Sequence, residues 1–468
     1  MNPCLRDFSS RGFSFLNKVK TFGKFRLLVH LCCTFVPMLT EKTMEKLRVL
    51  TESAKYDVSC SSSGTVRSGK KGMIGNTVGG VGICHSFADD GRCISLLKIM
   101  LTNHCMYDCA YCINRRSNDI QRATLSVSEL EEITMEFYRR NYIEGLFLSS
   151  GVVRNPDYTM ERLTAIVRDL RTIHRFNGYI HLKAIPGASQ ELLNEAGRWA
   201  DRMSVNIEIP KEESLKALAP EKDHQSVFQP MRLIQTGVLE NIEERKKFRH
   251  APRFVPAGQS TQMIVGATGE TDQDILQMSS SLYQQPSMRR VYYSGYISVN
   301  TYDKRLPILK QPPLVRENRL YQADWLLRFY HFNVDEIVDD AHSHLDLDID
   351  PKLGWALRHP EYFPVDINRD DYERILRVPG IGTKSAWLIV NSRRFNHITS
   401  YHLKKMGVVM KKAKYFITCG ELTSTFSQPI VGINELYPER LRPLLASKSQ
   451  QRRAAQEQQL TLDFKETE

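Results

Sequence analysis

The chain has 468 residues, of which 41% are hydrophobic, so it has room for two or three globular domains and is not a mainly disordered protein. Sixty-four Lys and Arg against 53 Asp and Glu give a formal net charge of +11, which indicates a polyanionic partner if the charge is concentrated. The apolar run at residues 27–39 is too short to cross a bilayer, so we expect no membrane association and a cytoplasmic protein.

Residues 1–43 differ from the rest of the chain. They carry seven basic and two acidic residues ahead of and around the apolar run, which imitates a targeting segment. No small-residue cleavage site follows Leu39, however. We therefore interpret these residues as an N-terminal extension without a fold of its own, with Met38 or Met44 as alternative starts, and keep a targeting segment as the alternative.

Residues 44–94 form a region rich in Cys, Gly and Ser. The ten cysteines of the chain are concentrated in its first quarter, which favours metal chemistry in a reducing compartment over disulfides. Three of them, Cys60, Cys84 and Cys93, precede the main cysteine motif. They either ligate a second metal centre, such as a second iron–sulfur cluster, or pack as small buried side chains, and their long spacing leaves both readings open.

The most informative stretch contains Cys105, Cys109 and Cys112, spaced C-x3-C-x2-C directly after a β-like run. A loop of this length can turn three thiolates towards one point. A 4Fe-4S cluster normally takes four cysteines, so this spacing leaves one iron open. Zinc would require a further ligand pair, which does not follow, and cysteines used only for packing are the remaining alternative.

This motif, with Tyr111 before the last cysteine, resembles the signature of the radical S-adenosylmethionine (SAM) superfamily. The resemblance implies that Cys105, Cys109 and Cys112 hold a 4Fe-4S cluster whose open iron binds SAM. It also implies that an electron from a reductase, flavodoxin or ferredoxin leads to a 5′-deoxyadenosyl radical. The cofactors carry this chemistry, and the protein supplies geometry and excludes water.

From residue 95 to about 300, β-rich runs alternate with amphipathic helical stretches. The expected strands are 96–102, 146–150, 179–185, 203–209, 262–265 and 291–299, and the clearest helices are 127–140, 160–174 and 189–200. Such an order predicts a parallel α/β sheet curled into a partial (βα)6 barrel within a domain spanning 95–345, including a helical stretch at 316–345. Ligands of such barrels gather at the carboxyl ends of the strands, where the cysteine loop lies.

Three segments at the same strand ends resemble the SAM-contacting parts of the superfamily. Ser149, Ser150 and Gly151 stand where a glycine-rich segment meets the SAM amino group, although here two positions are serine. Asn206 and Glu208 share one face of a strand by their spacing of two, at the place of ribose or carboxylate contacts. The predicted adenine-binding segment contains Val265, Gly266 and Glu270.

A second motif lies within residues 346–425, which we predict to be a small all-α domain. Gly380, Ile381 and Gly382 separate two short helical stretches, so that backbone amides face outward at a helix N-terminus. The segment resembles a helix-hairpin-helix, a DNA-backbone binder, and residues 403–416 resemble a degenerate second copy. Residues 369–420 hold eleven Lys and Arg against three acids, and the expected DNA contacts include Lys384, Arg393 and Arg394.

Residues 426–468 are predicted to be an irregular to disordered tail. Within it, Gln459, Leu460, Leu462 and Phe464 form an apolar peptide with no core to join, which makes it a candidate docking segment. The peptide resembles the motif by which bacterial replication and repair proteins bind the sliding clamp.

For residues 370–391, the alternative to the DNA motif is a helical hairpin used for packing or protein contact.

Taken together, the chain from Met44 onward resembles the bacterial radical SAM proteins described as DNA modification or repair proteins. The resemblance implies a radical SAM enzyme that generates a 5′-deoxyadenosyl radical to modify or repair DNA. Two alternatives stay open: an RNA-modifying radical SAM enzyme, and a non-catalytic iron–sulfur protein that binds DNA and senses redox state. The lack of a fourth cysteine within residues 103–116 argues against the second alternative.

Overall fold

The computed structural model describes residues 40–56, 83–87, 93–419, 442 and 445. The chain divides into two compact units, Met1–Glu45 and Lys46–Glu468. Of the first unit, only the beginning of helix α2 (Glu41–Ser53) and the residue before it fall within the described residues. A single 3-10 turn, η1 (Ala54–Tyr56), follows α2 in the second unit.

The second unit is built on a seven-stranded sheet in the order β1 to β7. Its strands are β1 (Ile83–Phe87), β2 (Cys93–Met100), β3 (Gly145–Ser149), β4 (Tyr179–Lys183), β5 (Arg202–Ser204), β6 (Gln259–Val265) and β7 (Met288–Gly295). Strands β2 to β7 are mutually parallel, whereas β1 pairs antiparallel with β2. The predicted α/β half-barrel of six parallel strands is thus confirmed, and β1 is an edge strand that the sequence pattern did not indicate.

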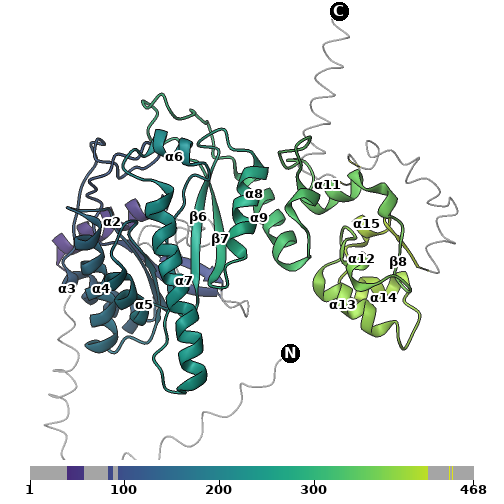
Figure 1. Ribbon diagram of the computed structural model, residues 1–468, viewed down its shortest axis with the longest axis horizontal. Coiled ribbons are helices and arrows are strands. Elements are labelled where there is room, and N and C mark those ends of the chain that lie inside the picture. The colour runs from purple at the N-terminus through teal and green to yellow at the C-terminus, as the bar shows by residue number, and fades with distance from the viewer. Residues whose placement is uncertain (1–39, 57–82, 88–92, 420–441, 443–444, 446–468) are drawn as a thin grey trace, which may run out of the picture. The chain divides into compact units, whose positions relative to one another are not determined.

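Helices alternate with these strands as the predicted crossover pattern requires. They are α3 (Val127–Arg139), α4 (Pro156–Thr172), α5 (Gln190–Trp199), α6 (Glu212–Leu218), α7 (His224–Lys247), α8 (Asp272–Tyr283) and α9 (Leu314–Phe329). Helices α3, α4 and α5 pack side by side along the sheet, and α8 and α9 pack on β7 (Figure 1). Capping fixes where they begin: Ser126 and Glu129 form a capping box at α3, and Asn155 caps α4 ahead of Pro156.

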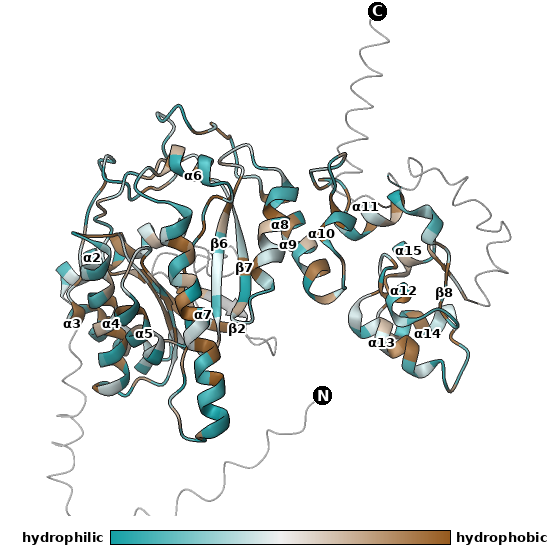
Figure 2. Cartoon of the chain, viewed as in Figure 1, coloured by the Kyte–Doolittle hydropathy of each residue, from teal (hydrophilic) through white to brown (hydrophobic). Residues whose placement is uncertain are grey.

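The strands differ in polarity across the sheet. All five residues of β3 are buried, as expected for a parallel strand covered on both faces. Strand β6 begins instead with four buried polar residues, Gln259 to Gln262, and is drawn largely in pale and teal tones in Figure 2. Gln259 donates to the Met231 carbonyl and the Ser287 hydroxyl. A buried polar strand is costly unless it is hydrogen-bonded, and these two contacts offset part of the cost of burying Gln259.

Two predicted elements are shorter than expected. The strand predicted for residues 203–209 ends at Ser204, because Glu208 adopts a left-handed backbone (φ 65°) and forms only an isolated bridge with Met263. The helix predicted for 316–345 ends at Phe329, because His331 is also left-handed (φ 56°), and only the short α10 (Val334–Ile337) follows. Period-two and period-3.6 patterns carry no information on such single left-handed residues.

The C-terminal part contains the helices α11 (Pro351–Arg358), α12 (Tyr372–Leu376), α13 (Thr383–Ser392), α14 (Ser400–Lys405) and α15 (Met410–Ala413), with a 3-10 turn at Pro360–Tyr362. It also contains two short parallel strands, β8 (Val365–Asp366) and β9 (Ile417–Thr418). The expectation of an all-α domain is therefore corrected: this strand pair joins the two ends of the helical segment. Within the described ranges, no helix is both long and apolar enough to cross a membrane.

Candidate active site

The cysteine loop starts directly after β2 and is closed at its base. Cys109 is buried, and Cys105 and Cys112 are half-buried. Thr102 and Thr124 share a hydroxyl hydrogen bond of 2.7 Å across the two ends of the loop. These ends hold the loop at the carboxyl edge of the sheet, where the sequence predicted it.

Asn103 reinforces this closure from a fully buried position. Its Nδ2 donates to the Gln121 carbonyl at 2.9 Å, and its Oδ1 accepts from the Ala123 amide at 2.8 Å. The three thiols therefore project from a loop of fixed span.

Arg122 holds the interior of the loop. Its guanidinium donates to four backbone carbonyls, those of Asn103, Asn114, Arg115 and Asn118. A planar guanidinium with a rigid set of donors can satisfy four converging carbonyls, which a lysine cannot do in the same geometry. Arg122 thus organises the backbone on both sides of the cysteines without touching a thiol.

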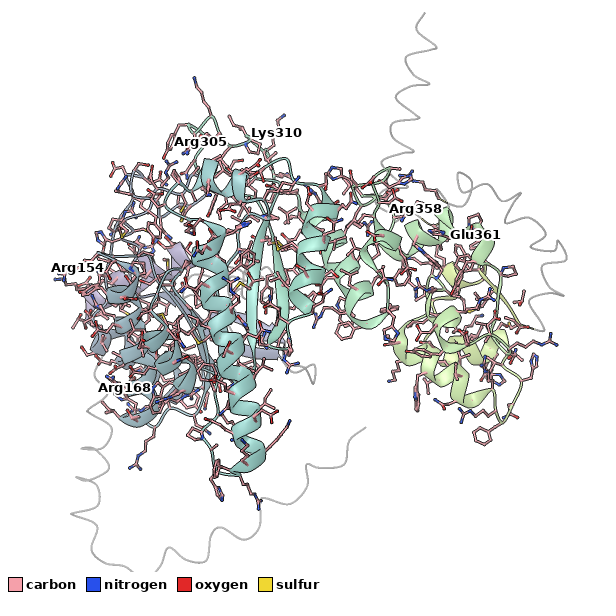
Figure 3. All side chains as sticks on the ribbon, in the orientation of Figure 1. Arg154, Arg168, Arg305, Lys310, Arg358 and Glu361 are labelled. Atoms are coloured by element: carbon pink, nitrogen blue, oxygen red, sulfur yellow. The ribbon has the colours of Figure 1, made fainter. Side chains whose placement is uncertain are left out.

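An ion-pair chain ties the cysteine loop to the segment after β7. Arg115 binds Asp108 at 2.6 Å and Asp303 at 2.8 Å, and Asp303 also binds Arg305 at 2.7 Å. Arg305, labelled in Figure 3, donates to the Ala217 carbonyl at the end of α6. The hydrogen bond from Arg115 holds the pKa of Asp108 well below its ordinary value, so this carboxylate stays ionised.

Asn300 is a further support that no sequence pattern indicated. Its Nδ2 donates to the carbonyl of Ala110 at 2.6 Å and to that of Cys112 at 3.0 Å. Its Oδ1 accepts from Asn118 at 2.8 Å. Because these contacts span about 190 residues of sequence, only the folded barrel brings Asn300 to the cysteine turn.

The predicted segment after β3 packs directly on the cysteine loop. The Gly151 amide donates to the Thr102 carbonyl at 2.8 Å. A Cβ atom at position 151 would lie 2.2 Å from the His104 carbonyl oxygen and 3.3 Å from Cys105 Cβ. Glycine is therefore required here for close approach of two backbones, while Ser150 turns its hydroxyl back to the Gly151 carbonyl.

Glu208, predicted as a SAM contact, meets the cysteine loop through Tyr111, whose hydroxyl donates to its carboxylate. Lys222 binds the same carboxylate at 2.9 Å. Burial opposes ionisation of Glu208, yet Lys222 and Lys183 keep its pKa below the ordinary value. Burial likewise opposes the charge on Lys222, but the neighbouring Cys109 and Glu208 raise its pKa. Asn206, in contrast, is buried and donates to Gln262 at 3.2 Å.

The end of β6 completes the wall around the cysteines. Ala267 belongs to one apolar cluster with Cys109, Ala110 and Tyr296, against which Tyr111 and Cys112 also pack. Val265 is buried, and Gly266 is left-handed (φ 85°), which turns the chain over the site.

Buried oxygen atoms without a hydrogen-bond partner mark the same strand ends. Those at the strand ends include Ser149 Oγ, Thr268 Oγ1 and Glu270 Oε1, and others among the described residues lie elsewhere, such as Gln259 Oε1. Buried polar atoms are normally paired, so such atoms indicate a place for a polar ligand. Ser149 and Glu270 were both predicted SAM contacts, and this observation fits a polar cofactor beside the cysteine loop.

The thiols themselves fit a cluster. Each of the three lies within electrostatic range of the other two, and burial raises the pKa of Cys109 to about 11 and that of Cys112 to about 12. Metal ligation requires the thiolate form, so iron binding would release these protons. In the described part of the chain, no three Cys, His, Asp or Glu side chains converge on a single-ion site. A 4Fe-4S cluster does not need that convergence, because each cysteine binds a different iron.

The predicted second metal site receives no support from the described residues. Cys84 lies on β1 opposite Leu96, and Cys93 is the first residue of β2, whereas the cysteine loop follows the last residue. Eight strand residues rise about 23 Å. Cys93 therefore lies at the opposite end of β2 from the loop that carries Cys105. Cys60 lies outside the described residues.

At the segment predicted to be a DNA motif, a turn separates α12 from α13. Gly380 is left-handed (φ 91°), and a Cβ there would lie 2.7 Å from the Val409 carbonyl oxygen. A matching turn with left-handed Gly407 joins α14 to α15, and the Val409 amide donates to the Gly380 carbonyl at 2.9 Å. The two glycine turns are thus hydrogen-bonded to each other.

Side chains around these turns divide into two groups. Lys384 and Arg394 are exposed, whereas Ile381 is buried. Arg393 donates to the carbonyls of Ile367 and Asp370, so its guanidinium supports the fold rather than pointing to solvent. The predicted clamp peptide, residues 459–464, lies outside the described residues.

Comparisons with known proteins agree with this site. Residues 99–282 match the family model of the radical SAM superfamily. A comparison with the curated proteins found no match. The match covers the segment that carries the cysteine loop and most of the half-barrel, so this part of the chain is similar to the radical SAM superfamily.

Several solved structures are similar over about half of the chain. The FeFe-hydrogenase maturase HydG from Carboxydothermus hydrogenoformans is 12% identical, with a TM-score of 0.38, over 49% of this chain and 50% of that one. Methylornithine synthase (PylB) is 13% identical, with a TM-score of 0.36, over 49% and 61%. HemN, the coproporphyrinogen III oxidase of Escherichia coli, is 12% identical, with a TM-score of 0.29, over 48% and 50%. The chain thus spans about half the length of HydG and HemN, and these likenesses carry no conclusion about activity.

Proposed function

We propose that this chain is a radical SAM enzyme that uses Cys105, Cys109 and Cys112 to hold a 4Fe-4S cluster and that acts on DNA. The observation that carries the enzymatic part is the closed three-cysteine loop beside buried, unpartnered oxygen atoms at the strand ends. When bound, the cluster and SAM supply the one-electron chemistry that generates a 5′-deoxyadenosyl radical.

The residues of the chain have distinct parts in this proposal. Ser149 and Glu270 would bind polar groups of SAM through their unpartnered oxygen atoms. Gly151 keeps the β3 end against the cysteine loop, and Asn300 holds the carbonyls of the cysteine turn. The apolar cluster of Cys109, Ala267 and Tyr296 would exclude water from the reacting atoms. Lys222 and Tyr111 fix the Glu208 carboxylate beside the apolar cluster.

The DNA part rests on charge and on the two glycine turns. From residue 374 to residue 419 the sequence contains ten Lys and Arg and no Asp or Glu. Among the described residues, Lys384, Arg394, Lys404, Lys405 and Lys411 form no ion pair with an acid, and all five are exposed. Exposed cations beside two linked glycine turns support binding to a phosphate backbone without base specificity.

The DNA part is tested by anaerobic binding of a labelled duplex to the reconstituted chain. Replacing Gly380 and Gly382 by Ala together should weaken binding, because the first methyl meets the Val409 carbonyl at 2.7 Å. Gly354→Ala is the matched control, since its Cβ would meet nothing closer than 3.7 Å. Lys384→Gln, at an exposed position, should lower the slope of log affinity against log salt by about 1 without altering the fold. Equal duplex binding by all variants would refute the role of the turns.

A further inference from the structure

Aromatic and basic side chains alternate along α13 and the turn that follows it. Lys384 and Trp387 lie on α13, and Arg394 and Phe395 lie in the turn just after its last residue, Ser392; we call these four residues the α13 stripe. The turn is hydrogen-bonded to the helix end, because the amides of Phe395 and Asn396 both donate to the Ser392 carbonyl.

Both rings of the stripe face solvent. Trp387 is 60% exposed and Phe395 is 84% exposed. In the described part of the chain, neither ring stacks on another aromatic ring or on a cation. Large apolar side chains are normally buried, so two exposed rings, one on α13 and one just past its end, point to a partner that covers them.

The charge around the rings defines the chemistry of that partner. Lys384 precedes Trp387 and Arg394 follows it along the stripe, both are exposed, and the surrounding segment 374–419 has no acidic residue. The stripe starts in the first turn of α13, immediately after the Gly382 turn, so it continues from the proposed phosphate-binding hairpin. A polyanion with flat apolar faces complements this arrangement, and an unpaired nucleic-acid strand has both features.

We propose that the α13 stripe is a stacking surface for an unpaired nucleic-acid strand, with its bases on Trp387 and Phe395 and its phosphates on Lys384 and Arg394. This inference rests on the proposed function and narrows its substrate: the target is a site where a strand is single or locally opened. A base that is to react in the barrel must leave the duplex stack, and a surface that holds unpaired bases lowers the cost of that opening.

The test is fluorescence anisotropy with the full reconstituted chain. The probes are a labelled single-stranded DNA of about 16 nucleotides, as long as the largest site of one OB-fold module, and the duplex of the same sequence. Trp387→Ala and Phe395→Ala should each weaken single-strand binding about 10-fold, and the double variant about 100-fold, while duplex binding changes little. Trp325→Ala and Phe248→Ala, exposed rings at 48% and 68% outside the C-terminal segment, are the matched controls.

The possible results separate the two claims. Single-strand affinity of the double variant equal to that of the wild type would overturn the stacking surface, whatever the duplex data show. Base-free polyphosphate that competes as well as unlabelled single-stranded DNA at the same phosphate concentration would also overturn it, because charge alone would then explain binding. A changed oligomeric mass in the double variant with unchanged single-strand affinity would identify the stripe as an interface between copies. Absent duplex binding by the wild type, together with ring-dependent single-strand binding, would refute only the hairpin role in the proposed function.

Discussion

Replacing Gly151 by Ala tests how the cysteine loop is held. The new Cβ would lie 2.2 Å from the His104 carbonyl oxygen and 3.0 Å from the His104 carbonyl carbon, both backbone atoms that cannot rotate away. An ordinary contact requires a displacement of about 1 Å, and overpacking of this kind costs about 1–3 kcal/mol. Because ligands of a site must be held within about 0.5 Å, the displaced Cys105 should bind iron poorly even if the variant folds.

The assay compares iron content after anaerobic reconstitution with the free energy of unfolding of the unreconstituted chain. Gly151→Ala should retain less than roughly half of the wild-type iron and lose about 1–3 kcal/mol of stability. Gly269→Ala is the matched control, because nothing lies within 4 Å of its Cβ and its backbone is not left-handed. Wild-type iron content in Gly151→Ala would refute the claim that close contact at this glycine positions the loop.

Three further predictions concern residues that act through hydrogen bonds. Asn300→Ala removes the hydrogen bonds to the Ala110 and Cys112 carbonyls and should lower the free energy of unfolding by about 1–3 kcal/mol. It should also speed the loss of iron on dilution. An unchanged rate of iron release would argue against a supporting role for Asn300. Arg122→Lys keeps at most some of the four hydrogen bonds to backbone carbonyls and should lower the midpoint of unfolding. The control is Arg139→Lys, on a side chain that is 64% exposed, which should leave the midpoint unchanged. Equal midpoints for the two variants would contradict the role of Arg122. Burial lowers the pKa of Lys352 to about 7, while its amine donates to the Ile381 carbonyl at 2.6 Å. Between that pH and 10.5 the unfolded chain binds a proton that the folded chain does not, so the stability of the wild type relative to Lys352→Met should rise with pH. The rise between about pH 6 and about pH 9 should be about 3 kcal/mol and is measured by denaturant unfolding at these two pH values; a pH-independent difference would refute it.

The sequence was sufficient for the barrel and the cysteine loop because their signals are local. Strands such as β3 are continuous apolar runs, and the helices between them show clear periodicity and caps. The spacing of Cys105, Cys109 and Cys112 likewise depends on one short segment. Signals of this kind can be recognised without knowledge of the tertiary contacts.

The supports of the site were not predictable in the same way. Asn300 reaches the cysteine turn from the segment after β7, and Lys222 reaches Glu208 from the connection between α6 and α7. Each is a single polar residue whose role arises only when distant segments meet. Lys222 stands out only because its side chain is buried, and the burial of a single lysine cannot be read from the sequence.

Two errors have a common physical origin. Glu208 interrupted a predicted strand, and His331 ended a predicted helix, because each adopts a left-handed backbone. Non-glycine residues rarely do so, and the cost of about 1–3 kcal/mol is tolerated when the surroundings determine the conformation. At Glu208 those surroundings are Tyr111 and Lys222, so the mispredicted position coincides with the candidate site.

The central claim is tested most directly by anaerobic reconstitution of the wild type and Cys109→Ala with iron and sulfide. Iron is counted, and 5′-deoxyadenosine is measured after reduction with dithionite in the presence of SAM. The account predicts about four irons per wild-type chain, formation of 5′-deoxyadenosine, and loss of that product in Cys109→Ala. A cluster that leaves SAM intact, with and without DNA, would contradict the assignment as an enzyme and identify an iron–sulfur DNA-binding protein.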